Sequence, residues 1–375
     1  MKRALIIGLF AGVAGELPAQ RPRLALDTTA AESVRVWTDV GYARPNADSA
    51  RFDVYLPPLA RGRRPVIVVG MNQRGSAQLQ AWARLLAAHG FAAVIFDMPG
   101  QLSADFDALI ASIQRGAGGA ELDGDNVGWW LASGMVYMGL PIAMEPGREH
   151  LRAVAAYYGA PPRVDFRLDR PALIVRVGMD QVSLNRSIDS MVFRALAANA
   201  PVTVINHPAG YHPFEVTDSS GHARYVLRQT IAFFQAALRP EYQADARAMA
   251  ANEGAVGQAM YAGDGARAAG ILERLVVADT GNAELVRQLA MAQLTAGRYR
   301  AANASFNRAR ALRHWRRGDI AVGGISACWR MNDRQCVRDW LATLPRQWNR
   351  RDLLGRLEFA DLRNDAAFVE ALTGP

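Results

Sequence analysis

The chain has 375 residues, of which 50% are apolar and 21% charged, a composition that excludes disordered, collagen-like and coiled-coil proteins. The net charge is +8: residues 1–240 carry 24 basic and 20 acidic side chains, and residues 241–375 carry 19 and 15. Because this excess is spread evenly rather than gathered in one stripe, we expect no nucleic-acid partner. The length predicts two domains, or three.

The N-terminus has the layout of a secretory signal peptide. A short basic start precedes an apolar, uncharged run over residues 4–15, and the sequence Glu-Leu-Pro-Ala-Gln ends it. The run is too short to span a bilayer comfortably. We therefore expect a signal peptide over residues 1–19, cleaved after Ala19 or alternatively after Ala14, and an exported mature chain without a membrane span. A buried N-terminal strand or helix is the competing interpretation.

Residues 34–238 alternate short apolar runs with amphipathic helical patterns. The apolar runs predict strands over residues 34–40, 51–56, 65–70, 91–97, 127–132, 153–159, 172–178 and 202–206. The amphipathic patterns predict helices over residues 76–89, 105–115, 184–198 and 223–238. Such alternation favours a mostly parallel sheet with helices on both faces. The first two strands have no helix between them and are expected to form an antiparallel hairpin at the edge.

After Arg239 and Pro240 the pattern becomes helical throughout. A 34-residue period relates Gly263, Gly297 and Met331, then Ala268, Ala302 and Cys336, then Leu272, Phe306 and Trp340. Over about residues 250–345 this resembles the tetratricopeptide repeat, which implies a surface for a protein or peptide partner. An ordinary helical bundle is the alternative. We thus expect a first domain over residues 20–240 and helical repeats over residues 241–375.

Ser133 is the strongest candidate for a catalytic residue. The apolar strand over residues 127–132 runs directly into Ser133 and Gly134, and an apolar helical pattern follows. This is the strand–turn–helix context of a nucleophile elbow, in which the neighbours of the nucleophile must be small. Leu131 and Met135 depart from the usual G-x-S-x-G pattern. A helix-capping serine is the alternative interpretation.

An acid and a histidine follow Ser133, each after a later strand. Asp180 comes after the strand over residues 172–178, and His212 lies in the loop beyond the last strand. The carboxyl ends of parallel strands meet at one rim of the sheet, so the three side chains form a candidate triad. His212 would take the serine proton, and Asp180 would orient the imidazole. His207 as the base and Asp97 as the acid remain alternatives.

Backbone N–H groups must also receive the negative oxygen of the reaction intermediate. The amide of Gly134 is one candidate, and the loop after residues 65–70 places Met71 or Asn72 as the second. Cys328 and Cys336 are too few for a four-ligand zinc site, and no histidines show ligand spacing. We therefore assign no metal and no cofactor.

Residues 34–238 resemble an α/β-hydrolase of the dienelactone hydrolase type. The resemblance rests on residues 65–72, 91–100 and 122–128, and on the motifs Gly-Met-Asp180 and His212-Pro-Phe. It implies Ser133, Asp180 and His212 as the triad, and hydrolysis of a small ester, thioester or lactone through an acyl-enzyme. The short segment between Gly159 and Pro171 suggests an open site without a large lid. A catalytically weak scaffold that acts through its repeats and a peptidase remain alternatives.

Overall fold

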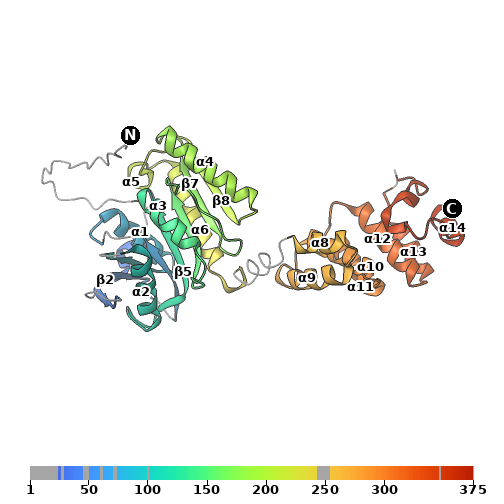
Figure 1. The fold of residues 1–375 in the computed structure, drawn as a ribbon, viewed down its shortest axis with the longest axis horizontal. Helices are drawn as coiled ribbons and strands as arrows, with labels where there is room; N and C mark the ends of the chain where they lie inside the picture. The colour runs from blue at the N-terminus through green and yellow to red at the C-terminus, as the bar shows by residue number, and fades with distance from the viewer. Residues whose placement is uncertain are drawn as a thin grey trace, which may run out of the picture. The chain divides into compact units, whose positions relative to one another are not determined.

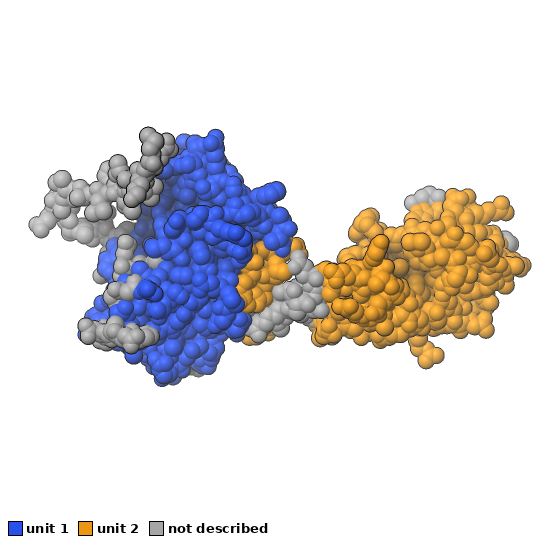
Figure 2. Space-filling view, in the orientation of Figure 1, with its two compact units in different colours: residues 1–165, 172–198, 202–235 blue, residues 166–171, 199–201, 236–375 orange. Residues whose placement is uncertain are grey.

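The computed structural model describes residues 24–26, 29–44, 50–59, 62–70, 74–98, 101–242, 254–345 and 348–374. The chain divides into two compact units (Figure 2). Residues 1–165, 172–198 and 202–235 form the first, and residues 166–171, 199–201 and 236–375 form the second. The predicted signal peptide, residues 1–19, lies outside the described residues. Within the described ranges, no helix combines the length and the apolar character needed to cross a membrane.

The first unit is built on an eight-stranded sheet with strand order β1-β2-β4-β3-β5-β6-β7-β8 (Figure 1). The strands are β1 (Arg35–Tyr42), β2 (Ala50–Leu56), β3 (Arg64–Val69), β4 (Ala92–Phe96), β5 (Leu122–Ala132), β6 (Leu151–Tyr157), β7 (Ala172–Val177) and β8 (Val202–His207). β2 pairs antiparallel with β1 and with β4, and all later pairs are parallel. This confirms the predicted α/β-hydrolase fold class, including the antiparallel hairpin at the edge.

Helices cover both faces of this sheet. They are α1 (Ala77–Ala88), α2 (Leu102–Gln114), α3 (Gly134–Met144), α4 (Val182–Ala197), α5 (Phe214–Thr217) and α6 (Gly221–Ala237), after a 3-10 turn over Thr29–Ser33. Trp130 of β5 packs on Trp82 of α1 with ring centroids 4.6 Å apart, and Trp129 stacks on Phe106 of α2 at 4.1 Å. Adjacent strand residues point to opposite faces, so α1 and α2 cover opposite sides of β5.

The central strand β5 is longer than predicted. It begins at Leu122 rather than Val127, because Leu122 and Asp123 already pair with Arg64 and Pro65 of β3. The register between the two strands then shifts, and Val127 pairs with the next residue of β3. Residues 123–126 are polar or glycine, so no apolar run marks this part in the sequence. Beyond the shift, every residue from Val127 to the end of β5 is buried. Continuous burial of this kind is expected for a parallel strand covered on both faces.

The second unit contains the helices that follow residue 253 (Figure 1). They are α8 (Ala255–Tyr261), α9 (Gly265–Ala278), α10 (Ala283–Thr295), α11 (Tyr299–Ala311), α12 (Arg317–Arg330), α13 (Arg334–Leu341) and α14 (Ala366–Thr373), with 3-10 turns at Asp352–Gly355 and Leu357–Phe359. α9 and α11 begin 34 residues apart, and so do α10 and α12. The predicted helical character of this part is confirmed, while its assignment to tetratricopeptide repeats stays a prediction.

Of the positions related by the predicted 34-residue spacing, the large apolar one matches in all three copies, whereas the turn position matches in two. The large apolar residues of the series are buried, namely Leu272, Phe306 and Trp340. Gly263 and Gly297 end their helices in left-handed turns with φ 74° and 72°. In the third copy the left-handed position belongs to Asn332, with φ 57°, and not to Met331. The turn after α12 is thus shifted by one residue from the predicted register.

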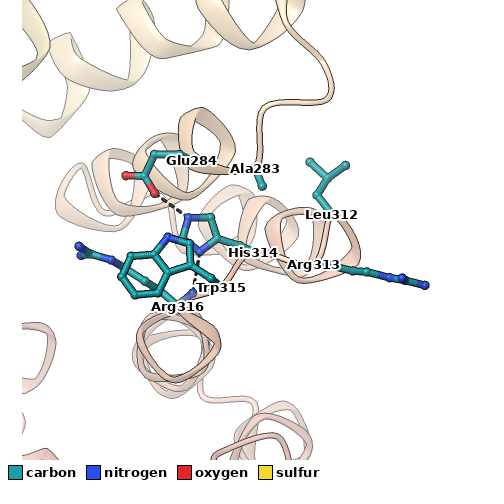
Figure 3. Close-up of a pocket in the computed structure, with 7 residues that line it drawn as sticks. All are labelled: Ala283, Glu284, Leu312, Arg313, His314, Trp315 and Arg316. Atoms are coloured by element: carbon teal, nitrogen blue, oxygen red, sulfur yellow. Dashed lines mark hydrogen bonds and ion pairs between the residues drawn. The ribbon is translucent and has the colours of Figure 1, made fainter.

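The turn between α11 and α12 forms a pocket of about 440 Å³ (Figure 3). The buried His314 lies 2.6 Å from a carboxylate oxygen of Glu284 through Nε2, and its Nδ1 accepts the Arg316 N–H at 3.0 Å. Trp315 beside it is 77% exposed, with the Arg316 guanidinium 4.7 Å from the centre of its ring.

Cys328 of α12 and Cys336 of α13 form a disulfide, a pairing that the sequence left open.

Close packing at Gly324 predicts a specific effect on the helical unit. A Cβ at Gly324 would lie 2.2 Å from the Trp340 ring, whereas one at Gly270 of α9 would meet no atom within 4 Å. We expect Gly324→Ala to lower the free energy of unfolding by about 1–3 kcal/mol, and Gly270→Ala to raise it by up to about 1 kcal/mol through helix propensity. Urea denaturation followed by helical circular dichroism measures both. Equal stability of the two variants would contradict the packing described for α12 and α13.

Candidate active site

Ser133 occupies the sharp turn between β5 and α3. Its backbone has φ 57° and ψ −130°, a conformation that residues with a Cβ rarely adopt, and such strain costs on the order of 1–3 kcal/mol. Ser133 stands at the N-cap position, but its side chain makes no capping hydrogen bond. The interpretation as a helix-capping serine therefore lacks the bond that would define it.

Asp180 and His212 contact each other through their side chains. Nδ1 of His212 lies 3.0 Å from Oδ2 of Asp180, although the residues are 32 positions apart in the sequence. The parallel pairing of β7 and β8 brings Val177 opposite His207, so the loops that follow both strands start side by side. The side chain of Asp180 is 9% exposed and that of His212 is 31% exposed. The acid is thus shielded from water while the imidazole remains accessible.

Backbone hydrogen bonds join the turn that carries Asp180 to the loop that carries His212. The N–H of Gly178 donates to the carbonyl of His207 at 2.8 Å, and the N–H of Met179 donates to that of Gly210 at 3.1 Å. A Cβ at Gly178 would lie 2.2 Å from the carbonyl oxygen of Pro208. Glycine at this position is therefore what allows the two loops to approach.

Residues 157–159, at the end of β6, connect Ser133 to His212. The N–H of Ser133 donates to the carbonyl of Tyr157 at 2.9 Å, and a Cβ at Gly159 would lie 2.4 Å from the carbonyl oxygen of Ser133. Between these two contacts, Tyr158 places its ring 4.2 Å from the imidazole of His212, measured between centroids. Among the described residues, no hydrogen bond joins the Ser133 hydroxyl to His212. Catalytic hydrogen bonds often tighten only when substrate binds.

Gly134, the first predicted oxyanion donor, begins α3 directly after Ser133. A Cβ at this position would meet no atom within 4 Å, so the space beside the residue is open. The other predicted donors, Met71 and Asn72, lie outside the described residues. The residue before them is fixed, because the N–H of Gly70 donates to the carbonyl of Trp130 at 2.8 Å.

Arg74, the first described residue after this gap, was not identified from the sequence, and its side chain is held by three carboxylates. Its guanidinium lies 2.7 Å from Asp53, 2.9 Å from Asp97 and 3.1 Å from Asp39. Asp97, the alternative candidate for the catalytic acid, directly follows β4 and forms an ion pair with Arg74. No short motif links Arg74 to these carboxylates, which come from three different strands or strand ends.

His207, the alternative base, is the last residue of β8, which extends one residue beyond the strand predicted over residues 202–206. It is 2% exposed, its Nε2 lies 2.8 Å from Asp218, and its ring packs edge-on against Phe214 at 5.0 Å. A buried histidine bonded in this way anchors the loop and is poorly placed to act on a substrate. In the described part of the chain, no group of three or more His, Cys, Asp or Glu side chains could hold a metal ion.

Glu215 is a fully buried carboxyl group that the sequence analysis also missed. It accepts hydrogen bonds from the Tyr158 hydroxyl and, at 2.7 Å, from the side-chain amide of Gln78. Burial raises the pKa of Glu215 above its ordinary value, although the Tyr158 hydrogen bond lowers it. The pKa of Tyr158 is raised well above 10, first by burial and second by the charge of Glu215. The phenol therefore keeps its proton and donates it in the hydrogen bond to Glu215. In the sequence, the one feature that could have drawn attention to Glu215 is its place directly after the apolar Phe214.

A pocket of about 890 Å³ opens beside His212. Its lining includes hydroxyl, imidazole and phenol side chains from residues Tyr211, His212, Thr217, Ser219, Ser220 and His222. Tyr211, next to the predicted base, is 59% exposed. A small polar molecule could therefore reach His212 from solvent.

No family model matches the sequence, and no curated protein matches it. Solved structures similar to the chain include a protein named as a dienelactone hydrolase from Klebsiella pneumoniae, with 17% identity over 54% of this chain and 99% of that chain and a TM-score of 0.44. An esterase from Rhizomucor miehei has 10% identity over 54% and 84%, with a TM-score of 0.45. Brefeldin A esterase, described as a bacterial homologue of human hormone-sensitive lipase, has 12% identity over 60% and 80%, with a TM-score of 0.45. Similarities at this level carry no conclusion about the activity of this chain.

The contact between Gly178 and Pro208 predicts a loss of stability at the site. Gly178→Ala would press a methyl group into backbone, and we expect the free energy of unfolding to fall by about 1–3 kcal/mol. Gly221→Ala at the start of α6, where a Cβ meets nothing within 4 Å, is the matched control and should be near neutral. Urea denaturation of both variants measures the difference. A Gly178→Ala protein as stable as the control would mean that the two loops are free to separate.

Proposed function

We propose that this protein is a serine hydrolase that cleaves a small ester, thioester or lactone through an acyl-enzyme on Ser133. His212 is the proposed base and Asp180 the residue that orients it. The amides of Gly134 and of Met71 or Asn72 are the proposed oxyanion donors. The protein needs no cofactor in this proposal.

The observation that carries this proposal is the strained backbone of Ser133. A serine with φ 57° at the end of a buried strand, without a capping hydrogen bond, has no structural explanation in the helix that follows. A turn of this kind presents a side chain at the rim of the sheet, which is what a nucleophile requires. The 3.0 Å contact between His212 and Asp180 supplies a base with its orienting acid near the same rim.

The proposed reaction follows the general chemistry of a serine nucleophile. The Ser133 oxygen attacks the carbonyl carbon of the substrate while His212 accepts the hydroxyl proton, and the carbonyl oxygen becomes an oxyanion held by backbone amides. The bond to the leaving group then breaks, and the leaving alcohol or thiol takes the proton from His212. Water repeats these steps on the acyl-enzyme and releases the acid. Asp180 stabilises the imidazolium in both halves of the reaction.

The access to the site favours a small substrate. Residues 160–171, where a lid would be inserted, contain no helix or strand. The pocket beside His212 is lined by polar side chains as well as by Tyr211, although Ser133 is not among its lining residues, and it opens the proposed base to solvent. A small or polar acyl substrate fits these features better than a long-chain lipid, and a peptide bond remains an alternative target on the same residues.

The proposal places the enzyme outside the cytoplasm, after removal of residues 1–19 as a signal peptide. The Cys328–Cys336 disulfide supports an oxidising compartment, where disulfides persist. We propose a hydrolase domain over residues 20–240 and tetratricopeptide-like repeats over residues 241–375.

A second candidate function is a scaffold with little or no catalysis that binds a protein partner through its helical repeats. The observation that favours it is Trp315, an indole that is 77% exposed at the pocket between α11 and α12 (Figure 3). Exposed tryptophans and arginines are enriched at protein interfaces. A fluorophosphonate probe separates the two functions, because only an activated serine reacts with it.

We expect Ser133→Ala to abolish both hydrolysis of short p-nitrophenyl esters and labelling by the fluorophosphonate probe, with a loss in kcat of about 10⁶. Ser190→Ala is the matched control, since the Ser190 hydroxyl donates only to the carbonyl of Arg186 in its own helix, at 2.8 Å. Steady-state rates and labelling of the intact protein measure both. A Ser133→Ala protein that keeps a tenth of the wild-type rate would refute the proposed nucleophile. A wild-type protein that neither hydrolyses these esters nor takes up the probe would favour the scaffold.

We expect Asp180→Asn and His212→Ala each to disable the enzyme, with little further loss when they are combined, because the triad acts as a unit. His207→Ala should instead lower stability and leave most of the activity, because His207 is buried against Asp218. Rates of ester hydrolysis together with urea denaturation of all four proteins distinguish these effects. If His207→Ala abolished the activity and His212→Ala did not, His207 would be the base.

A further inference from the structure

The side chain of Tyr158 lies against one face of the His212 imidazole. The ring centroids are 4.2 Å apart and the planes meet at 41°, and Tyr158 is only 1% exposed. The Tyr158 N–H donates to the carbonyl of Val175 at 2.7 Å, and its backbone has φ 35°, a left-handed value that aromatic residues rarely adopt. The ring is therefore held in a defined place beside the proposed base.

The hydroxyl end of Tyr158 is tied to the segment that carries His212. It donates a hydrogen bond to Oε1 of Glu215, and Gln78 of α1 donates to the same oxygen at 2.7 Å. The backbone carbonyl of Glu215 accepts the N–H of Ala25 at 3.1 Å. Glu215 comes three residues after His212. Tyr158 thus touches this segment at two points, with its ring at His212 and with its hydroxyl at Glu215.

A single hydrogen bond does not fix the orientation of an imidazole ring. The 3.0 Å contact with Asp180 holds Nδ1 of His212, but the ring can still tilt about its side-chain bonds within the tolerance of that one hydrogen bond. Proton transfer from Ser133 requires Nε2 within hydrogen-bond reach of the serine oxygen. An aromatic surface on one face of the imidazole restricts this pivoting. Its π electrons also favour the imidazolium that forms when the proton arrives.

Burying the carboxyl group of Glu215 beside a tyrosine is unfavourable for the stability of the fold. Among the described residues, Oε2 of Glu215 has no hydrogen-bond partner of normal geometry, although the indole N–H of Trp82 lies near enough to lower the pKa of this carboxyl group. A buried carboxyl group with an unmade bond destabilises a fold, and apolar side chains of similar volume often stabilise a core better than buried charged groups. The presence of Glu215 therefore points to a role that an apolar residue could not fill.

We propose that Tyr158 and Glu215 are positioning residues that hold the His212 imidazole in the orientation needed to accept the Ser133 proton, an inference that rests on the proposed hydrolase function. Tyr158 supplies the surface on which the imidazole lies. Glu215 fixes the hydroxyl of that tyrosine, and Gln78 fixes Glu215. Both positioning residues act through His212 and not on the substrate.

Three variants test this proposal by steady-state hydrolysis of p-nitrophenyl acetate. Tyr158→Phe keeps the ring but loses its bond to Glu215, and we expect kcat to fall about 10-fold with KM unchanged. Tyr158→Leu removes the surface, and kcat should fall about 100-fold. Glu215→Gln keeps a carbonyl oxygen that can accept the Tyr158 hydroxyl, so kcat should stay within about three-fold of the wild type.

Tyr42→Phe is the matched control. Tyr42 is a buried tyrosine of β1, and its hydroxyl donates to the backbone carbonyl of Asp97 at 2.5 Å. The variant loses a buried phenol hydrogen bond as Tyr158→Phe does, but at the opposite edge of the sheet from β7 and β8. We expect similar losses of stability in urea and an unchanged kcat for Tyr42→Phe. A loss of kcat confined to Tyr158→Phe would thus exceed any general effect of destabilisation.

A second readout does not depend on turnover. The Tyr158 ring shifts the proton resonances of the His212 imidazole, which NMR can assign by their absence in His212→Ala. We expect Glu215→Gln to keep this ring-current shift, Tyr158→Phe to change it and Tyr158→Leu to abolish it. An unchanged shift in Tyr158→Phe, together with a kcat within about two-fold of the Tyr42→Phe value, would overturn the positioning role.

These outcomes separate the inference from the function on which it rests. If the wild type neither hydrolyses esters nor reacts with the fluorophosphonate probe, the proposed function fails, and the NMR comparison alone decides whether Tyr158 orients His212. If the wild type is active and all three variants keep its kcat, the hydrolase stands and the positioning role is refuted. If Tyr158→Leu does not fold, Tyr158→Phe and Glu215→Gln still decide.

Discussion

The burial of both faces of β5 is the constraint on which the rest of the first unit depends. Trp129 and Trp130 point to opposite sides of the strand and stack on helices there. Gly128 leaves no room for a side chain, because a Cβ would lie 2.7 Å from Ile67 and 2.8 Å from Phe234 of α6. A strand wedged between helices in this way cannot shift along its axis without opening the core. The position of Ser133, one residue beyond its end, is therefore fixed by packing and not by the loop itself.

The remaining groups of the site take their positions from the strands that follow β5 in the sheet. β6, β7 and β8 pair in parallel, so the segments after them emerge at one edge. The approach of these segments is close enough to exclude a Cβ at Gly159, against the Ser133 carbonyl, and at Gly178, against Pro208. Contacts between backbone atoms hold the site together, which makes the geometry insensitive to the identity of most surrounding side chains. This tolerance fits an elbow in which Leu131 and Met135 replace the usual glycines.

The sequence predicted what depends on local pattern and missed what depends on packing between distant segments. Short apolar runs, several of them continuous, predicted the eight strands, and their order placed Ser133, Asp180 and His212 after β5, β7 and β8. The polar start of β5 was not predicted, because pairing with β3, rather than apolar character, makes it a strand. The roles of Arg74 and Glu215 were not predicted, because their hydrogen-bonding partners are far away in the sequence. A single charged residue also carries no periodic signal. The predicted roles of Met71 and Asn72 stay predictions, since both lie outside the described residues.

Three unfavourable features of the first unit lie next to one another, and this bears on the choice between an enzyme and a scaffold. Ser133 and Tyr158 both hold left-handed backbone conformations, and Glu215 keeps a buried carboxyl oxygen without a hydrogen bond. Each feature destabilises the native state, and each contacts the next: the segment of Tyr158 holds Ser133, and the Tyr158 hydroxyl holds Glu215. Local rules are broken mainly where function requires it. A scaffold that bound partners only through its helical unit would have no use for strain concentrated around a serine, a histidine and an aspartate, so this arrangement favours catalysis.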